Sequence, residues 1–371
     1  MKIGITGQEG FIGLHLYNTL CLFPDIFDII PFKKEFFNDS QELNNFVSSC
    51  DVIVHLAALN RHSDPEVIFE TNIGLVEKLI RSLEATNSCA HVFFSSSSQE
   101  DNDNLYGKSK KIGRELFIDW AKRSEGTFTG LVIPNVFGPF GNPFYNSFIA
   151  TFSHQLLNNQ TPIVNKNSLI KLIYVGDLVK KIIEEIESGV GKDTLVVSHT
   201  DEKGVSEILS LLVRYKNEYF GLGIIPVLND RFEVNIFNTF RSFIDIEEEF
   251  PKALMKHTDP RGSFVEILRL NIGGQVSFST TLAGVTRGNH FHTRKIERFA
   301  VIKGKALIQL RRIGSDKIYD FYLDGEEPSY VDMPIWYTHN IKNIGDDELY
   351  TNFWINEFYD AADSDTFMEE V

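Results

Sequence analysis

Three histidines and one glutamate form the pattern in this sequence with the clearest chemistry. His290 and His292 are two positions apart, so on a β-strand their imidazoles point to the same face. Glu297 follows them closely, and His339 lies in a second strand-like segment. Imidazole nitrogens and a carboxylate suit a divalent metal ion. The basic and small residues from Arg287 to His290 also suit a different role, in which His290 removes a proton as a base.

A serine, a tyrosine and a lysine in the first half of the chain form a second pattern. Tyr106 and Lys110 are four positions apart, so on a helix they lie on one face. An ammonium group near a phenol favours the phenolate, and we expect Lys110 to lower the pKa of Tyr106 from about 10. We expect Ser97 to hold a carbonyl oxygen while Tyr106 delivers a proton and a nicotinamide cofactor delivers a hydride.

A glycine-rich turn precedes these residues. Residues 2–6 are predicted to form a short buried strand, and an apolar helix begins inside the turn that follows. Glycines permit a tight turn and close approach to a phosphate, and the helix N-terminus favours a pyrophosphate. The predicted cofactor contacts in this turn are Gly7, Gly10, Phe11, Ile12 and Gly13.

The strands that follow extend this dinucleotide-binding pattern. A strand over 28–32 leads into Lys33 and Lys34, where an NAD-preferring site usually has an acidic residue. Two lysines suit a 2′-phosphate and favour NADPH; the alternative is that they are solvated surface charges. Strands alternate with helices through residue 135, which predicts an α/β fold with a doubly wound, Rossmann-type parallel sheet. Ligands bind beyond the carboxyl ends of such strands, where the serine run and Leu56-Ala57-Ala58 fall.

The second half of the chain has a different pattern. Residues 241–258 combine an acidic cluster with a proline and show no sustained period, so we predict domains of 1–245 and 246–371. Beyond this boundary short alternating strands recur between turn residues, which predicts an all-β barrel or jelly roll.

Composition limits the classes of partner. The net charge of −15 over 371 residues argues against nucleic acid as a general partner. No apolar run is long enough to span a bilayer, and the N-terminus starts directly as a strand rather than as a signal peptide. The three cysteines lack a pairing or metal-binding spacing, so we expect a cytoplasmic protein without membrane insertion.

These motifs give residues 1 to about 240 a resemblance to the extended short-chain dehydrogenases/reductases of nucleotide-sugar metabolism. The resemblance assigns the glycine turn to the cofactor and Ser97, Tyr106 and Lys110 to catalysis. It adds Pro134, in a segment that closes over the nicotinamide, to the cofactor contacts. The arginine that often reaches a substrate phosphate in this family is absent near Ile170 and Lys171.

The second domain resembles the cupins, from Gly284 through the His-x-His pair to Gly304. This resemblance implies that His290, His292, Glu297 and His339 bind a metal ion, expected to be zinc; the alternative is that these side chains only fill the interior. The same region is similar to epimerases of nucleotide-linked 4-keto-6-deoxy sugars. That similarity implies that Arg261 and Arg287 bind substrate phosphates, unless they are surface charges, and that His290 is the base.

The pairing of the two domains resembles bifunctional enzymes of bacterial capsular polysaccharide synthesis. It implies a UDP-linked 4-keto-6-deoxy sugar as substrate, C3 epimerisation by the cupin, and then NADPH-dependent C4 reduction to UDP-2-acetamido-2,6-dideoxy-L-talose, on the way to UDP-N-acetyl-L-fucosamine. The segment that ends at Arg61 belongs to this resemblance, and we expect Arg61 to bind substrate.

Two other functions stay open at this point. The cupin could be only a binding or dimerisation module, and we expect a homodimer in either case. A 4,6-dehydratase is the weaker alternative, because Ser98-Gln99-Glu100 replaces the acidic pair that such enzymes carry after the serine.

Overall fold

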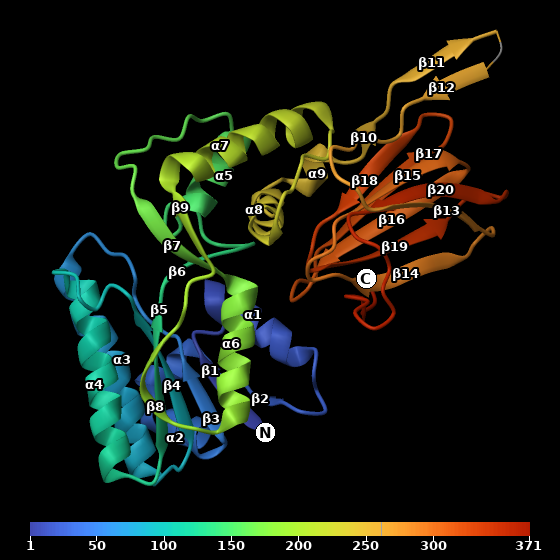
Figure 1. Ribbon diagram of the computed structural model, residues 1–371. Helices are drawn as coiled ribbons and strands as arrows, with labels where there is room; N and C mark the ends of the chain where they lie inside the picture. The colour runs from blue at the N-terminus through green and yellow to red at the C-terminus, as the bar shows by residue number, and fades with distance from the viewer. Residues whose placement is uncertain (261) are drawn as a thin grey trace. The chain divides into compact units, whose positions relative to one another are not determined.

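The computed structural model describes residues 1–260 and 262–371, which form two compact units (Figure 1). The first unit contains Met1–Thr151 and Val164–Ser206, and the second contains Phe152–Ile163 and Glu207–Val371. Among the described residues, no helix is both long and apolar enough to cross a membrane.

A six-stranded sheet forms the centre of the first unit. In spatial order its strands are β2 (Asp28–Ile30), β1 (Lys2–Thr6), β3 (Val52–His55), β4 (His91–Ser97), β5 (Thr127–Ile133) and β8 (Lys192–Val196). All neighbouring strands run parallel. Successive residues of β3 are buried on opposite faces, since Ile53 joins one hydrophobic core and Val54 joins the other. The predicted doubly wound parallel sheet is therefore confirmed.

Helices cover both faces of this sheet (Figure 1). One face packs against α2 (Ser40–Ser48), α3 (Pro65–Ala85) and α4 (Leu105–Arg123), and the other against α1 (Phe11–Cys21) and α6 (Val175–Ser188). The remaining elements are the short helix η1 (Lys34–Asn38), helix α5 (Phe148–Leu157) and a small sheet of β6 (Asn135–Phe137), β7 (Leu169–Tyr174) and β9 (Asp201–Gly204).

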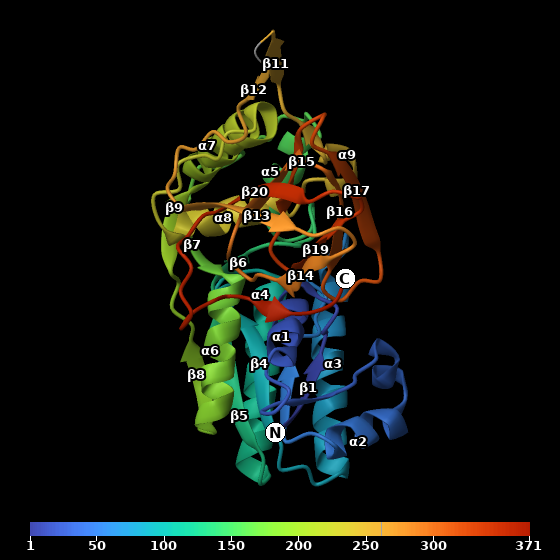
Figure 2. The same cartoon turned by 90° about the vertical axis from the view of Figure 1, so that its right-hand side faces the viewer.

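Two five-stranded antiparallel sheets dominate the second unit. One contains β10 (Lys252–Ala253), β18 (Ser329–Met333), β15 (Glu297–Lys303), β20 (Leu349–Ile355) and β13 (Gln275–Thr281). The other contains β17 (Ile318–Asp324), β16 (Lys305–Arg312), β19 (Tyr337–Asn343), β14 (Thr286–Phe291) and β21 (Phe367–Met368). A separate hairpin joins β11 (Lys256–Asp259) to β12 (Gly262–Val265). The C-terminus lies beside β14 and β19 in both views (Figure 2). The predicted all-β region is confirmed.

Helical residues before position 246 also belong to the second unit. They form most of α7 (Val205–Tyr215), the π-helical turn η2 (Lys216–Gly221) and α8 (Arg231–Arg241), and α9 (Ile246–Glu249) follows. A buried polar network joins them to the strands: the Tyr219 hydroxyl donates to Asp332 at 2.6 Å, and Arg241 donates to the Met333 carbonyl at 3.1 Å. Apart from Phe152–Ile163, the compact units therefore divide after residue 206, whereas the sequence placed the domain boundary after residue 245.

Candidate active sites

The glycine turn lies where β1 meets α1, as the sequence predicted. Gly7 has a φ of 78°, and a side chain there would lie 2.8 Å from the backbone nitrogen of Ala57. A Cβ on Gly13 would lie 2.1 Å from the Gly7 carbonyl oxygen. Helix α1 begins at Phe11 after Gly10, which supplies no side-chain cap. A turn this tight fits a pyrophosphate against the helix N-terminus.

The two lysines of the predicted NADPH preference lie at the same edge of the sheet. Gly4 of β1 pairs with Ile30 at the end of β2, so the carboxyl ends of these parallel strands lie next to each other. Lys33 and Lys34 follow β2 after Pro31 and Phe32, and both are exposed. Their ammonium groups are thus accessible to an anionic group at this edge.

Ser97 and Tyr106 come together in the structure. Ser97 ends β4, and Tyr106 lies in the first turn of α4, where the Ser97 side chain is near enough to the phenol to influence its pKa. The side chain of Asn104 caps this helix by accepting from the Gly107 N–H at 2.7 Å. Lys110, one turn further, is buried and donates to the Ser95 carbonyl at 2.9 Å. All three predicted catalytic residues of the first unit therefore share one site.

The expected effect of Lys110 on Tyr106 is wrong. Burial raises the pKa of Tyr106 to about 12; the Ser97 side chain opposes this rise, and the nearby Tyr145 adds to it. Lys110 lies 5.8 Å from the centroid of the Tyr106 ring, and burial lowers its own pKa to about 8. Tyr106 is therefore protonated at neutral pH, which suits a proton donor.

Arg61 contacts the chain's own backbone. It donates to the Tyr145 carbonyl at 3.2 Å and also to the Phe144 carbonyl. The Tyr145 hydroxyl accepts from the Asn60 N–H at 3.2 Å. Asn60 and Arg61 therefore both bind the loop that contains Tyr145. Pro134 lies between β5 and β6, next to Ile133, whose carbonyl accepts from the Ser98 N–H at 2.9 Å.

Asn72 is a functional candidate that sequence analysis missed. This buried residue of α3 bonds both backbone groups of Leu59, in the loop after β3, at 2.7 and 3.1 Å. Its amide also donates at 3.1 Å to the Ser109 hydroxyl on α4, one residue before Lys110. Asn72 thus joins the loop beyond β3 to the helix that carries Tyr106. Its position in an otherwise apolar helical face was the signal for it in the sequence.

The four predicted metal ligands converge in the second unit. His290 of β14 pairs directly with His339 of β19, His292 follows β14, and Glu297 begins β15 in the other sheet. One ligand atom from each of the four lies within 4.8 Å of the others. The Nε2 atoms of His292 and His339 are 3.1 and 3.2 Å from the same Glu297 oxygen.

The local strand geometry explains this convergence. The register of β14 against β19 shifts between Gly288 and His290. Gly288 has a φ of 99°, and a Cβ there would lie 2.8 Å from the carbonyl oxygen of His339. Because Gly288 has no side chain, the backbone of β14 can lie close to His339, the residue that pairs with His290.

Metal binding fits the donor atoms. His292 Nε2, His339 Nε2 and Glu297 Oε2 are buried and have no hydrogen-bond partner among the described residues. Buried polar atoms without partners are costly, and a cation between them would satisfy all three. Three imidazoles and a carboxylate suit zinc or a similar divalent ion.

The charges of the cluster are strongly shifted. Burial, with help from His339 and His292, lowers the pKa of His290 to about 4, so this residue is neutral at pH 7. Burial opposes ionisation of Glu297, but the close imidazoles of His292 and His339 outweigh it and hold the pKa of that carboxyl below its usual range. A neutral imidazole beside a carboxylate is the state that metal binding requires.

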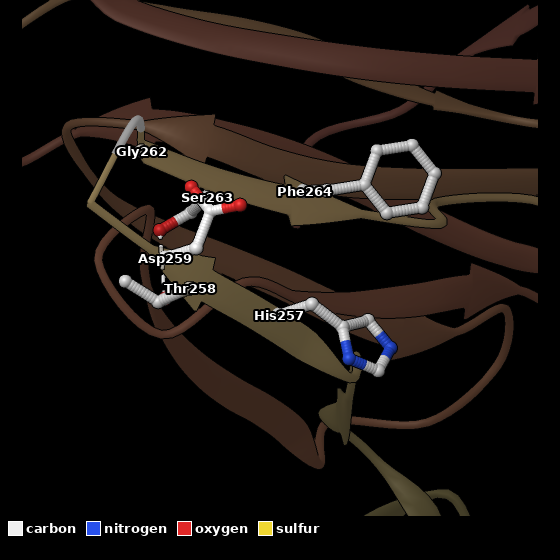
Figure 3. Close-up of a pocket in the computed structure, with 6 residues that line it drawn as sticks. All are labelled: His257, Thr258, Asp259, Gly262, Ser263 and Phe264. Carbon is white, nitrogen blue, oxygen red and sulfur yellow. Dashed lines mark hydrogen bonds between the residues drawn. The ribbon is translucent and has the colours of Figure 1, made fainter.

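Arg287 and Arg261 are the two predicted phosphate-binding arginines. Arg287 lies on β14 and is exposed. Arg261 lies outside the described residues. Its neighbours line a hollow on the β11–β12 hairpin, formed by His257, Thr258, Asp259, Gly262, Ser263 and Phe264 (Figure 3). The Thr258 and Ser263 hydroxyls are hydrogen-bonded across it at 2.9 Å, and none of the four metal-site residues lines it.

Comparison with known proteins agrees with this arrangement. Residues 3–197, more than half of the 371-residue chain, match the NAD dependent epimerase/dehydratase family. The chain belongs to that family. Residues 257–367 match the polysaccharide biosynthesis C-terminal domain.

Two relatives match over almost the whole chain. A Pseudomonas aeruginosa protein named UDP-2-acetamido-2,6-beta-L-arabino-hexul-4-ose reductase is 32% identical over 99% of this chain and 98% of its own. The crystal structure of capsular polysaccharide assembling protein CapF from Staphylococcus aureus is 33% identical, covers 100% of both chains and has a TM-score of 0.64. The structure of RMD from Pseudomonas aeruginosa complexed with NADPH, at 18% identity, covers 57% of this chain and 81% of its own with a TM-score of 0.52, and shows the fold alone.

Proposed function

We propose that this chain is a bifunctional nucleotide-sugar enzyme of capsule or O-antigen precursor synthesis. Its first domain would reduce the C4 ketone of a UDP-linked 2-acetamido-2,6-dideoxy-4-keto hexose, after its second domain has epimerised C3. The convergence of Ser97, Tyr106 and Lys110 in one site, with Tyr106 protonated at neutral pH, carries the reductase proposal. The full-length similarity to a protein named as a hexul-4-ose reductase supports the choice of substrate.

The reduction needs a proton at the C4 oxygen and a hydride at C4. NADPH, when bound, supplies the hydride. Ser97 and Tyr106 hydrogen-bond the carbonyl oxygen, and Tyr106 donates its proton as the alkoxide forms. Lys110 holds the end of β4 through the Ser95 carbonyl and places a positive charge near the phenol. Lys33 and Lys34, both exposed after β2, are the residues we propose for the 2′-phosphate.

The epimerisation is proposed for the histidine cluster in a cupin-type fold. A 4-keto group acidifies the hydrogen on C3, because the carbanion is delocalised into the carbonyl oxygen. His290, His292, Glu297 and His339 would hold a divalent metal ion, expected to be zinc, and such an ion would supply positive charge for the oxygen of the ketone. Reduction of C4 removes this acidification, so epimerisation precedes reduction. His290 cannot use one nitrogen both as metal ligand and as base, so the C3 base is another group if that nitrogen binds metal.

The acidic residue after the serine run does not favour dehydration. Arg114 donates to both oxygens of Glu100, at 2.9 and 2.7 Å, and the Ser96 hydroxyl also donates to this carboxylate. Burial opposes ionisation of Glu100, but these hydrogen bonds outweigh it and hold its pKa below the usual range. A carboxylate engaged in this way is a poor proton donor for removal of a 6-hydroxyl. The 4,6-dehydratase therefore remains the weaker alternative.

The test follows NADPH oxidation and deuterium uptake at C3 with the UDP-4-keto sugar as substrate. Tyr106→Phe removes the proton donor and should lower NADPH oxidation at least about 100-fold while deuterium uptake at C3 continues. His290→Ala should abolish deuterium uptake, and Tyr322→Phe, at an exposed tyrosine, should change neither activity.

Each failure has a different meaning. Loss of both activities in Tyr106→Phe would contradict two independent sites. Deuterium uptake that survives His290→Ala would contradict the role of this cupin histidine in C3 chemistry. A wild-type protein that oxidises NADPH but takes up no deuterium at C3 would favour the second candidate, a reductase whose cupin only binds sugar nucleotide or forms the dimer. A homodimer and a cytoplasmic location remain predictions.

A further inference from the structure

The C-terminal segment contributes to the histidine cluster although it supplies none of the four ligands. Strand β21 pairs antiparallel with β14, where Met368 faces His290 and Phe367 faces Phe291. The Phe367 and Phe291 rings are stacked with centroids 5.4 Å apart. The end of the chain is therefore a neighbour of the strand that presents the first two histidines.

Asp365, just before β21, anchors the turn between β14 and β15. Its carboxylate accepts hydrogen bonds from the backbone N–H groups of Thr293, Arg294 and Lys295 at 3.0–3.1 Å. It also accepts from the Thr293 hydroxyl at 2.6 Å. Asp365 is only 6% exposed, so burial removes most of the water around its carboxylate. The four donors replace the hydrogen bonds to that water.

The backbone of the same residue contacts a proposed metal ligand. The carbonyl oxygen of Asp365 lies 2.5 Å from Nδ1 of His292. A carbonyl can only accept, so Nδ1 carries the hydrogen and Nε2 is the atom left to bind a metal ion. Asp365 has a φ of 41°, a left-handed conformation that aspartate tolerates better than most residues. The four bonds to the carboxylate hold the residue in this conformation and so aim its carbonyl at the imidazole.

We infer that Asp365 is a positioning residue that fixes the tautomer and orientation of His292 for metal binding. The inference rests on the proposed metal site. It explains the two kinds of contact that Asp365 makes, although it lies 73 positions from His292 in the sequence. Its backbone contacts His292, and its side chain contacts the turn that follows His292. Hydrogen bonds of this kind from a ligating histidine to a carbonyl hold the ring and raise its basicity.

The experiment measures zinc affinity of the full chain by chelator competition. Asp365→Asn and Asp365→Gly both allow a positive φ but weaken or remove the four bonds to the turn. Both should lower zinc affinity about 10- to 100-fold. Asp363→Asn is the matched control, since this exposed carboxylate only pairs with Arg294 at 2.9 Å and should leave the affinity unchanged.

A second readout separates positioning from general stability. In zinc-loaded wild type, histidine ¹⁵N spectra should show a His292 Nδ1 hydrogen that exchanges slowly, and this protection should be lost in Asp365→Gly. Unchanged affinity and protection in both folded variants would overturn the inference, as would variants that fail to fold, because the carboxylate would then serve the fold as a whole. A wild-type protein that binds no zinc would instead overturn the proposed metal site.

Discussion

At the scale of single residues, burial determines the behaviour of the first site more than the spacing of its residues does. The spacing of Tyr106 and Lys110 in the sequence predicted that they share a site, and the structure places them together. Their protonation could not be predicted in the same way, because it depends on surrounding atoms from other elements. Burial raises the pKa of Tyr106 and lowers that of Lys110, so it shifts the titration of each group toward the neutral form.

The lowered pKa of Lys110 makes a prediction about pH. Because burial brings its pKa to about 8 from the usual 10.5, Lys110 is charged below pH 8 and loses its proton above it. If the ammonium charge assists Tyr106, ketone reduction should fall about tenfold per pH unit well above pH 8. Lys110→Arg keeps its charge at high pH, so this fall should disappear even if the maximal rate is lower.

The measurement is kcat/KM for reduction between pH 6 and 10. Lys108→Arg, at an exposed lysine paired with Asp103, is the control and should keep the wild-type profile. A wild-type profile that stays flat to pH 10 would show that the Lys110 charge is not needed.

At the scale of elements, local patterns predicted the sites and long-range contacts completed them. The strand, turn and helix around Gly7 and the His-x-His pair at His290 are visible in the sequence because their partners are close along the chain. Asn72 and Asp365 were missed because their contacts reach as far as 37 and 73 residues along the chain. Nothing in the residues around either position indicates those partners.

The crossing of β14 over β19 gives a prediction at the same scale. Gly288→Ala would place a Cβ 2.8 Å from the His339 carbonyl in a positive-φ conformation. We expect a loss of unfolding free energy of about 1–3 kcal/mol for the second unit, together with weaker zinc binding. Gly284→Ala is a matched control, since Gly284 also has a positive φ of 76° but has no heavy atom within 4 Å of its Cβ position.

The measurement is urea unfolding followed by tryptophan fluorescence. Trp120→Phe as the background leaves Trp336 and Trp354, which both lie in the second unit. In Gly284→Ala the free energy of unfolding should fall only by the cost of placing alanine at a positive φ, and zinc affinity should be unchanged. Equal losses of unfolding free energy in the two variants would show that the close approach of Gly288 to His339 does not affect stability.

At the scale of the whole molecule, the two compact units differ from the predicted domains for a physical reason. Helical periodicity in residues 207–245 resembles the helices before it, so the sequence assigned this stretch to the first domain. The buried ion pair of Arg298 with Asp332, at 2.7 Å, joins the strand that begins with Glu297 to β18. From the helical stretch, the Tyr219 hydroxyl donates to Asp332 and itself accepts from Arg241, which extends the hydrogen bonding that such a pair needs.

A pair of fragments tests this division. A fragment of residues 246–371 lacks Tyr219 and Arg241, so the buried Arg298–Asp332 pair and the Met333 carbonyl lose partners that water cannot fully replace. We expect this fragment to be aggregated or to give a poorly dispersed ¹H–¹⁵N spectrum, whereas a fragment of residues 207–371 should be folded and should bind zinc. Equal folding and zinc affinity in the two fragments would place the functional boundary after residue 245, as the sequence alone predicts.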